Sequence, residues 1–277
     1  MNLVVASPTG LCFGVRRAIG QLEDALTRYG VVYSLGSPIH NPPEVRRLMG
    51  LGLKLVDCAS DVPEGAVVFI RAHGVSKAEY DELGRRAGVV VDGTCPFVTN
   101  AREKAESLSG EGYFVVVLGD SNHPEVRGIL SYIEGESMVI SSEDDIDADT
   151  RYGRLGVLSQ TTQTEAGLAS VVSRLILHSG EVKVYNTICR ATIERQESIA
   201  RMSAKVDGIV VLGGKNSANT RKLVEAAESL GASALWIEHS DELDRGWVMG
   251  KESIGIAAGG STPDWLINDL TEKLKRL

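Results

Sequence analysis

Three cysteines stand alone in their segments, and each follows a short apolar run and precedes a stretch compatible with a helix. Cys12, Cys95 and Cys189 lack the paired C-x2-C spacing that is typical of structural zinc sites. Three separate thiolates instead suit an iron–sulfur cluster in which one iron has no cysteine ligand. An iron with an open position can act as a Lewis acid, so the pattern indicates metal-dependent chemistry. Cys58 has no counterpart elsewhere in the chain, and we exclude it from this set.

Polar side chains gather at turns that follow predicted strands. They include three of the five histidines, and the set is His40, His73, His123, Asn216, Ser217, Asn219 and Ser261. Imidazoles, amides, hydroxyls and the N–H groups at helix starts bind anions, so these residues predict a pocket for a phosphate or a diphosphate. The formal net charge of -8 is compatible with such a pocket, because the surface can be acidic while the pocket binds an anion.

Glu125 follows His123 and Pro124 at the predicted start of a helix. Glutamates at helix starts usually interact with the helix dipole, and Glu44 fits that role. Glu125 can instead deliver protons beside a metal group that supplies electrons. Thr161 and its neighbour Thr162 follow a predicted strand, where their hydroxyls could orient a substrate hydroxyl.

The elements that would position these residues recur three times along the chain. Four kinds of strand are repeated, and the predicted strands are 3–5, 89–91 and 182–184; 31–36, 114–119 and 209–213; 53–56, 137–140 and 234–237; and 69–73, 156–162 and 255–261. The predicted helices after the cysteines are 15–29, 98–110 and 190–204. Cys12 and Cys95 are 83 residues apart, as are His40 and His123. Matched spacings of this kind favour an internal repeat.

The repeat predicts an α/β fold of three pseudo-threefold-related units with small, mostly parallel sheets around a central iron–sulfur cluster. We place the first unit at residues 13–95, the second at 96–188 and the third at 189–277, completed by the N-terminal strand 1–12. Functional groups collect at the carboxyl ends of parallel strands, so units that share an axis would bring their thiols and polar turns together.

Composition excludes several classes of protein. No run of Lys and Arg interleaved with aromatic residues occurs in the 277 residues, so nucleic-acid binding is not expected. No apolar stretch reaches 18 residues, so we expect no membrane-spanning helix. The N-terminus lacks the features of a secretory signal, and we therefore expect a cytoplasmic protein.

The same residues carry a resemblance that runs over essentially the whole chain. The matching segments are Gly10–Val15, Ile39–Asn41, Ala72–Val75, Thr94–Pro96, His123–Val126, Gln160–Thr162, Ile188–Thr192, Arg195–Glu197, Lys215–Asn219 and Ala258–Asp264. In this order the segments are highly specific. The sequence resembles the LytB/IspH family of 4-hydroxy-3-methylbut-2-enyl diphosphate reductases.

The resemblance implies one [4Fe–4S] cluster per chain, with three cysteine ligands and one open iron that binds the substrate's oxygen. Two electrons and protons would remove that oxygen as water from the allylic diphosphate, giving isopentenyl and dimethylallyl diphosphate at the end of the non-mevalonate isoprenoid pathway. By matching position, the cluster ligands are Cys12, Cys95 and Cys189, the proton donor is Glu125, the residue that holds the hydroxyl and relays protons is Thr161, and the diphosphate ligands are His40, His73, His123, Ser217, Asn219 and Ser261. A ferredoxin or flavodoxin would supply the electrons, because the chain has no nicotinamide-binding fingerprint.

One departure from the family pattern lies within the substrate-binding segment. The family usually has Ser-Ser-Asn where this chain has Ser217, Ala218 and Asn219, so one hydroxyl donor is missing. A neutral hydrogen bond contributes about 0.5–1.5 kcal/mol, so we expect weaker substrate binding, or a water in place of the hydroxyl, and retained activity.

Other functions remain compatible with parts of the pattern. Another three-cysteine cluster enzyme of pseudo-threefold plan, such as quinolinate synthase, is the nearest alternative, but the segments His123–Val126 and Lys215–Asn219 favour the diphosphate reductase. An electron carrier would not need Glu125 beside a polar pocket, and an iron sensor would normally carry a partner-binding segment. The remaining alternative is a phosphate-binding α/β domain with incidental cysteines.

Overall fold

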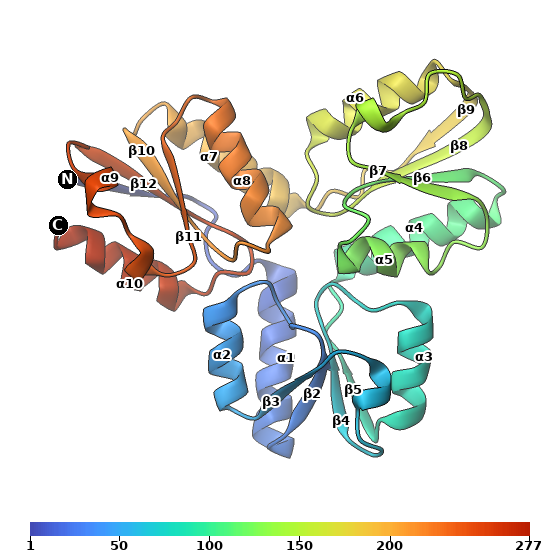
Figure 1. The fold of residues 1–277 in the computed structure, drawn as a ribbon, viewed down its shortest axis with the longest axis horizontal. Helices are drawn as coiled ribbons and strands as arrows, with labels where there is room; N and C mark the ends of the chain where they lie inside the picture. The colour runs from blue at the N-terminus through green and yellow to red at the C-terminus, as the bar shows by residue number, and fades with distance from the viewer. The chain divides into compact units, whose positions relative to one another are not determined.

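The computed structural model describes residues 1–277, which form three small sheets flanked by helices (Figure 1). The strands are β1 (Asn2–Val5), β2 (Val32–Leu35), β3 (Leu53–Val56), β4 (Val67–Ile70), β5 (Val89–Asp92), β6 (Phe114–Leu118), β7 (Ser137–Ile140), β8 (Tyr152–Ser159), β9 (Ser179–Val184), β10 (Gly208–Leu212), β11 (Ala234–Ile237) and β12 (Ser253–Ala258). The strands contain four to eight residues, which is within the usual range for globular proteins.

Helices connect most of the strands. The helices are α1 (Phe13–Tyr29), α2 (Pro42–Gly50), α3 (Lys77–Arg86), α4 (Pro96–Gly110), α5 (Pro124–Leu130), α6 (Glu165–Ile176), α7 (Arg190–Ser203), α8 (Ala218–Ser229), α9 (Arg245–Val248) and α10 (Asp264–Lys275), with short 3-10 turns at η1 (Ala59–Asp61), η2 (Glu143–Asp145) and η3 (Ser240–Glu242). No helix combines the length and the apolar character needed to cross a membrane.

The three sheets have the same strand order. They run β3-β2-β4-β5, β7-β6-β8-β9 and β11-β10-β12-β1, and every pair is parallel. The N-terminal strand β1 therefore occupies the position of β5 and β9, at the edge of the third sheet. This equivalence confirms the predicted α/β fold with three parallel sheets.

The chain forms two compact units, which we describe separately. Unit 1 contains Met1–Arg16, Ile39–Leu51 and Arg190–Leu277, and unit 2 contains Arg17–Pro38 and Gly52–Cys189. The third sheet lies in unit 1 and the other two lie in unit 2. The boundaries predicted for three units, at 13–95, 96–188 and 189–277, stay a prediction.

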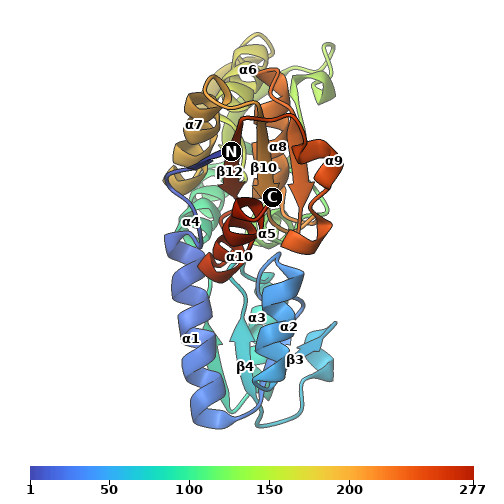
Figure 2. The same cartoon turned by 90° about the vertical axis from the view of Figure 1, so that its left-hand side faces the viewer.

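In unit 1, apolar side chains alternate along the central strand and fill both faces of the sheet. Ile209 and Val211 pack with residues of α7 and α8, whereas Val210 and Leu212 pack with residues of α10. α10 accordingly covers one face and α7 and α8 cover the other (Figures 1 and 2). Burial on both faces explains why these parallel strands are almost entirely apolar.

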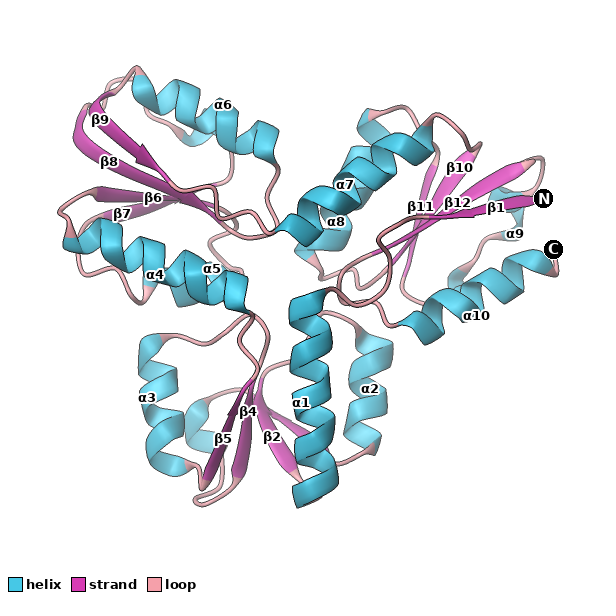
Figure 3. Cartoon of the chain, turned by 180° about the vertical axis from the view of Figure 1, so that it is seen from behind, coloured by secondary structure: helices cyan, strands magenta, loops and turns pink.

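In unit 2, the same arrangement occurs twice. Val115 and Val117 of β6 pack against α4 and α5, and α6 covers the opposite face of that sheet (Figure 3). Val68 and Ile70 of β4 pack with Leu83 of α3, and α1 lies on the other face of that sheet (Figures 1 and 3). All three sheets therefore have buried faces, and the polar site residues follow the ends of the strands.

Candidate active site

Each of the three predicted cluster ligands directly precedes a helix. Cys95 is the N-cap residue of α4, while Cys12 and Cys189 immediately precede the first residues of α1 and α7. All three are partly buried and none forms a disulfide, whereas Cys58 is exposed and lies 3.0 Å from the Ser60 hydroxyl. Iron is bound by the thiolate form of cysteine, so each of these side chains offers one sulfur ligand.

The backbone around the three cysteines repeats. The N–H of Cys12 donates to the carbonyl of Gly260 at 2.9 Å, that of Cys95 to Ala72 at 3.0 Å, and that of Cys189 to Thr161 at 2.9 Å. Each acceptor lies two residues beyond the end of an equivalent strand, namely β12, β4 or β8. The same backbone hydrogen bond therefore fixes all three cysteines, and three thiols at equivalent positions, none of them in a disulfide, fit the donor set of an iron–sulfur cluster.

Glu125 is buried, and both of its carboxylate oxygens accept hydrogen bonds from Thr161. The Thr161 N–H donates to Glu125 Oε1 at 2.7 Å, and the Thr161 hydroxyl donates to Oε2 at 2.9 Å. Glu125 is 2% exposed and Thr161 is 5% exposed, so water is largely excluded from this pair. The carbonyl of Thr161 is the acceptor for Cys189, so Thr161 joins the acid to a predicted cluster ligand.

Burial raises the pKa of Glu125 to about 7, although the two hydrogen bonds from Thr161 act in the opposite direction. Loss of solvent disfavours the charged carboxylate, and this effect on the pKa is larger than the opposite effect of the two hydrogen bonds. A carboxyl group with a pKa near neutrality can both hold and release a proton under ordinary conditions, which is what a general acid requires.

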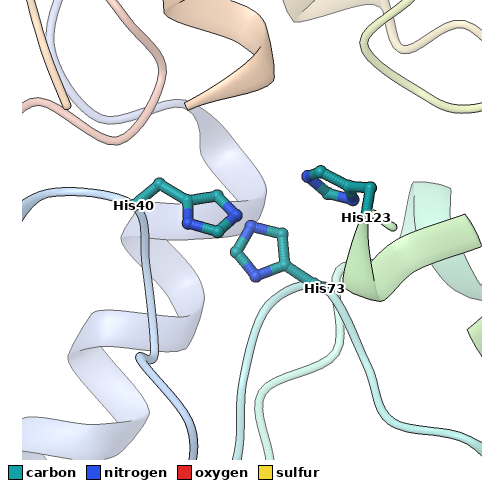
Figure 4. A group of neighbouring side chains, drawn as sticks. All are labelled: His40, His73 and His123. Carbon is teal, nitrogen blue, oxygen red and sulfur yellow. The ribbon is translucent and has the colours of Figure 1, made fainter. Parts of the chain in front are cut away.

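His73 and His123 meet edge to face in unit 2 (Figure 4). Their ring centroids are 5.5 Å apart and the ring planes are inclined by 85°. His123 is also the N-cap residue of α5, where its Nδ1 accepts from the N–H of Glu125 at 3.1 Å. An acceptor at Nδ1 assigns the proton of the neutral ring to Nε2, which can then donate to an anion.

In unit 1, the turn before α8 carries three predicted substrate-binding positions. Ser217 is the N-cap residue and its Oγ accepts from the N–H of Thr220 at 3.3 Å. Ala218 is the first residue of the helix, and Asn219 has a buried side-chain amide nitrogen with no hydrogen-bond partner in the protein. A buried amide without a partner is costly, so this donor fits a ligand oxygen.

His40 and Ser261 are also joined within unit 1. The Ser261 hydroxyl donates to the carbonyl of His40 at 3.2 Å. Gly214 lies against the same carbonyl, because a Cβ at this position would be 2.3 Å from the His40 oxygen. The hydroxyl predicted to bind diphosphate thus holds the histidine backbone in this structure.

The predicted residues are divided between the two units. Unit 1 holds Cys12, His40, Ser217, Ala218, Asn219 and Ser261, and unit 2 holds His73, Cys95, His123, Glu125, Thr161 and Cys189. Within unit 2 the structure joins Glu125 to Thr161 and His73 to His123.

Two features near these residues have no counterpart among the sequence predictions. A Cβ at Gly260 would lie 3.5 Å from Cys12 Sγ and 3.8 Å from Asn219 Nδ2, so the absence of a side chain leaves room beside both groups. In unit 2, the side chain of Gln160 is 1% exposed, and its Nε2 has no protein partner. Both residues belong to segments that carry the family resemblance, but spacing alone gives no indication of how close the groups are.

Known proteins similar to this chain cover it almost completely. A family model described as LytB protein matches residues 3–275. A protein from Geobacter sulfurreducens is 42% identical over 275 residues, which are 99% of this chain and 97% of that protein. A protein from Aquifex aeolicus is 40% identical over 281 residues, covering 100% of this chain and 97% of the relative. Both are named 4-hydroxy-3-methylbut-2-enyl diphosphate reductase.

Solved structures agree with these relatives. A structure titled as (E)-4-hydroxy-3-methyl-but-2-enyl diphosphate reductase, the terminal enzyme of the non-mevalonate pathway, is 40% identical, covers 100% of both chains and has a TM-score of 0.73. A reductase structure from Plasmodium falciparum is 24% identical, covers 98% of this chain and 87% of its own, and has a TM-score of 0.90, which supports the fold.

The three equivalent parallel sheets and these matches define an α/β oxidoreductase. Family membership follows from a model match over nearly the full length and from relatives of about 40% identity. The chain belongs to the LytB family.

Proposed function

We propose that this chain is an iron–sulfur reductase that converts (E)-4-hydroxy-3-methylbut-2-enyl diphosphate to isopentenyl and dimethylallyl diphosphate, the last step of the non-mevalonate pathway. The observation that carries the proposal is the position of Thr161. Its N–H and hydroxyl donate to the buried acid Glu125, and its carbonyl accepts from the N–H of Cys189. A proton source and a metal ligand are thereby bonded to the same residue.

We assign a [4Fe–4S] cluster to Cys12, Cys95 and Cys189. The cluster would supply electrons and, at the iron without a cysteine, a Lewis acid for the substrate hydroxyl. The repeated backbone hydrogen bond at each cysteine supports this assignment, because it gives three thiols the same local geometry. Cys58 is exposed and lies outside this pattern.

The reaction consumes two electrons and two protons, breaks the carbon–oxygen bond and releases water. Glu125 is the proton donor, and burial keeps part of its population protonated at neutral pH. The Thr161 hydroxyl donates to the carboxylate form of Glu125, and it can rotate to accept a hydrogen bond from the protonated form. This change of role lets Thr161 relay a proton to the hydroxyl that leaves.

The diphosphate ligands are His40, His73, His123, Ser217, Asn219 and Ser261. Support comes from the Nε2–H donor assigned to His123 and from the buried amide of Asn219. Imidazole, hydroxyl and amide donors can hold a diphosphate without an arginine cluster. The residues of Lys215–Asn219 follow a strand end, as anion-binding groups often do.

A ferredoxin or a flavodoxin is the electron donor that we propose, because the chain has no nicotinamide-binding fingerprint. We expect the reaction to take place in the cytoplasm, where cysteines remain reduced and can bind iron.

The test is anaerobic purification of the full chain, quantitation of iron and sulfide, and turnover of the hydroxylated C5 diphosphate with a strong reductant. We expect iron and sulfide in the proportion of a [4Fe–4S] cluster and both C5 products. A cluster that transfers electrons without converting the diphosphate would favour the electron-carrier alternative. A chain that binds diphosphate but no iron would favour a phosphate-binding domain.

A further inference from the structure

Helix α7 starts directly after Cys189, and its side chains hold the loop that leads to Cys12. The Arg195 Nη2 group donates to the carbonyl of Gly10 at 2.8 Å. One turn further along the helix, the Ser198 hydroxyl accepts from the N–H of Ser7 at 3.2 Å. Positions three residues apart share a helix face, so one face of α7 follows the loop.

Arg195 is the buried member of this face. Its side chain is 4% exposed, and a second guanidinium nitrogen, Nη1, donates to the carbonyl of Ala191 at 3.0 Å. A guanidinium is planar and always charged, so two bonds to fixed carbonyls orient it along the helix and against Gly10. Gly10 adopts a left-handed φ of 76°, and its carbonyl precedes Cys12 by two residues.

The Cys12 loop is also fixed at its far end. The N–H of Cys12 donates to the carbonyl of Gly260, and the Cβ position of Gly260 is 3.5 Å from Cys12 Sγ. The loop is therefore held by β12 through Gly260 and by α7 through Arg195. Helix α7 begins at the residue after Cys189. The hydrogen bond from Arg195 to Gly10 therefore connects the helix that follows the predicted ligand Cys189 to the loop that carries the predicted ligand Cys12.

We propose that Arg195 is a positioning residue for the cluster. Arg195 fixes the Cys12 loop to α7, and its buried positive charge favours reduction of the cluster. The inference rests on the proposed function. Each electron taken from the ferredoxin or flavodoxin makes the cluster and its thiolates more negative by one charge. A cation held in a poorly solvated position stabilises that reduced state more than a solvated one does.

The experiment compares the anaerobically purified native chain with Arg195→Met, Arg195→Lys and Arg201→Met. Arg201 is the matched control, since it lies on the same helix and donates to the Ser7 carbonyl at 3.4 Å, but its side chain is 60% exposed. The measurements are iron and sulfide content after gel filtration, and the midpoint potential from a reductive titration followed by visible absorbance and electron paramagnetic resonance.

We expect Arg195→Met to lose iron and sulfide and to have a lower midpoint potential in the cluster that remains. Arg195→Lys keeps the charge but loses the planar fork, so its potential should stay near the native value while its cluster content falls. Arg201→Met should match the native chain in both measurements.

Native cluster content and native potential in Arg195→Met would overturn the inference. If Arg195→Met does not fold, Arg195→Lys decides, because native cluster content in that variant would remove the positioning role. A native chain that holds no cluster would instead refute the proposed function, and the two failures are therefore distinguishable.

Discussion

The side-chain carboxyl of Glu125 receives both of its hydrogen bonds from one neighbour. Thr161 supplies two donors, yet the buried carboxyl still has a pKa of about 7, because loss of solvent outweighs those donors. The same residue pair therefore sets the fraction of Glu125 that can give up a proton and the group through which that proton passes.

Replacing Glu125 with Gln should retain the cluster spectrum and substrate binding and abolish nearly all turnover. An amide keeps the shape of the side chain but has no acidic proton, and general acid catalysis contributes about 10²- to 10⁴-fold to a rate. Single-turnover rates with a chemical reductant measure the loss, and the visible spectrum is the control. Native rates in the variant would remove Glu125 as the proton donor.

The raised pKa of Glu125 also predicts how stability depends on pH. The unfolded chain releases this proton near the ordinary value of 4.5, whereas the folded chain keeps it until about 7. The folded state thus binds more protons between these values, and stability falls as pH rises through this range, by about 3 kcal/mol for this group. Above pH 7 the contribution is constant.

Urea unfolding of the cluster-free native chain and of Glu125→Gln, at several pH values, isolates this contribution because the other groups cancel. The variant should gain stability relative to the native chain from pH 4.5 to 7. Parallel pH dependences in the two proteins would show that Glu125 titrates normally.

Ala218→Ser should restore the hydroxyl that the family pattern usually has. Ala218 is the first residue of α8, between the N-cap Ser217 and the buried amide of Asn219. One added hydrogen bond corresponds to about 0.5–1.5 kcal/mol, or roughly a 2- to 13-fold tighter substrate affinity. Isothermal titration with substrate measures the change, and equal affinities would sink the idea.

At the scale of elements, the repeated apolar runs predicted the four strands of each sheet. The predicted helices after the cysteines were confirmed as α1, α4 and α7, with ends within two residues of the expected positions. The periodicity of apolar residues within a segment is a local property, so a single sequence is enough to detect it. The order of the strands within each sheet was not predicted, and the structure shows it to be the same in all three sheets.

Contacts between segments that are distant in the sequence could not be predicted from periodicity or spacing. Arg195 and Gly10 are separated by 185 residues, and no periodicity indicates that a guanidinium meets that carbonyl. Trp265 donates to the buried carboxylate of Glu44 at 2.9 Å, whereas the sequence suggested only a helix-dipole role for Glu44. Such pairs depend on the angles at which helices pack, and those angles follow from the whole core.

Gly214→Ala should weaken substrate binding through the backbone of His40. The new methyl group would overlap the His40 carbonyl, which must then move away from Ser261. We expect a raised KM with an unchanged cluster spectrum, measured by steady-state kinetics. Gly84→Ala in α3 is the matched control, because nothing lies within 4 Å of its Cβ position. An unchanged KM in Gly214→Ala would contradict the role assigned to this close approach.

At the scale of the whole molecule, three of the four cysteines make the same backbone hydrogen bond at the end of an equivalent strand, and Cys58 does not. Cys95→Ser should lower iron and sulfide content severely, because a hydroxyl is a poor substitute for a thiolate. Cys58→Ser is the control and should retain full cluster content, since Cys58 is exposed and its thiol lies beside the Ser60 hydroxyl. Equal iron contents in the two variants would exclude Cys95 from the ligand set.

The hydrogen bond from each cysteine N–H ends on a backbone carbonyl, and a carbonyl is the same whatever side chain its residue carries. Ala72, Thr161 and Gly260 therefore accept the same hydrogen bond although their residue types differ. The residues that follow them, His73, Thr162 and Ser261, differ just as freely. Because each of these hydrogen bonds joins backbone atoms alone, the side chains at these turns can differ without changing how the cysteines are held, and substrate recognition can vary separately from the metal site.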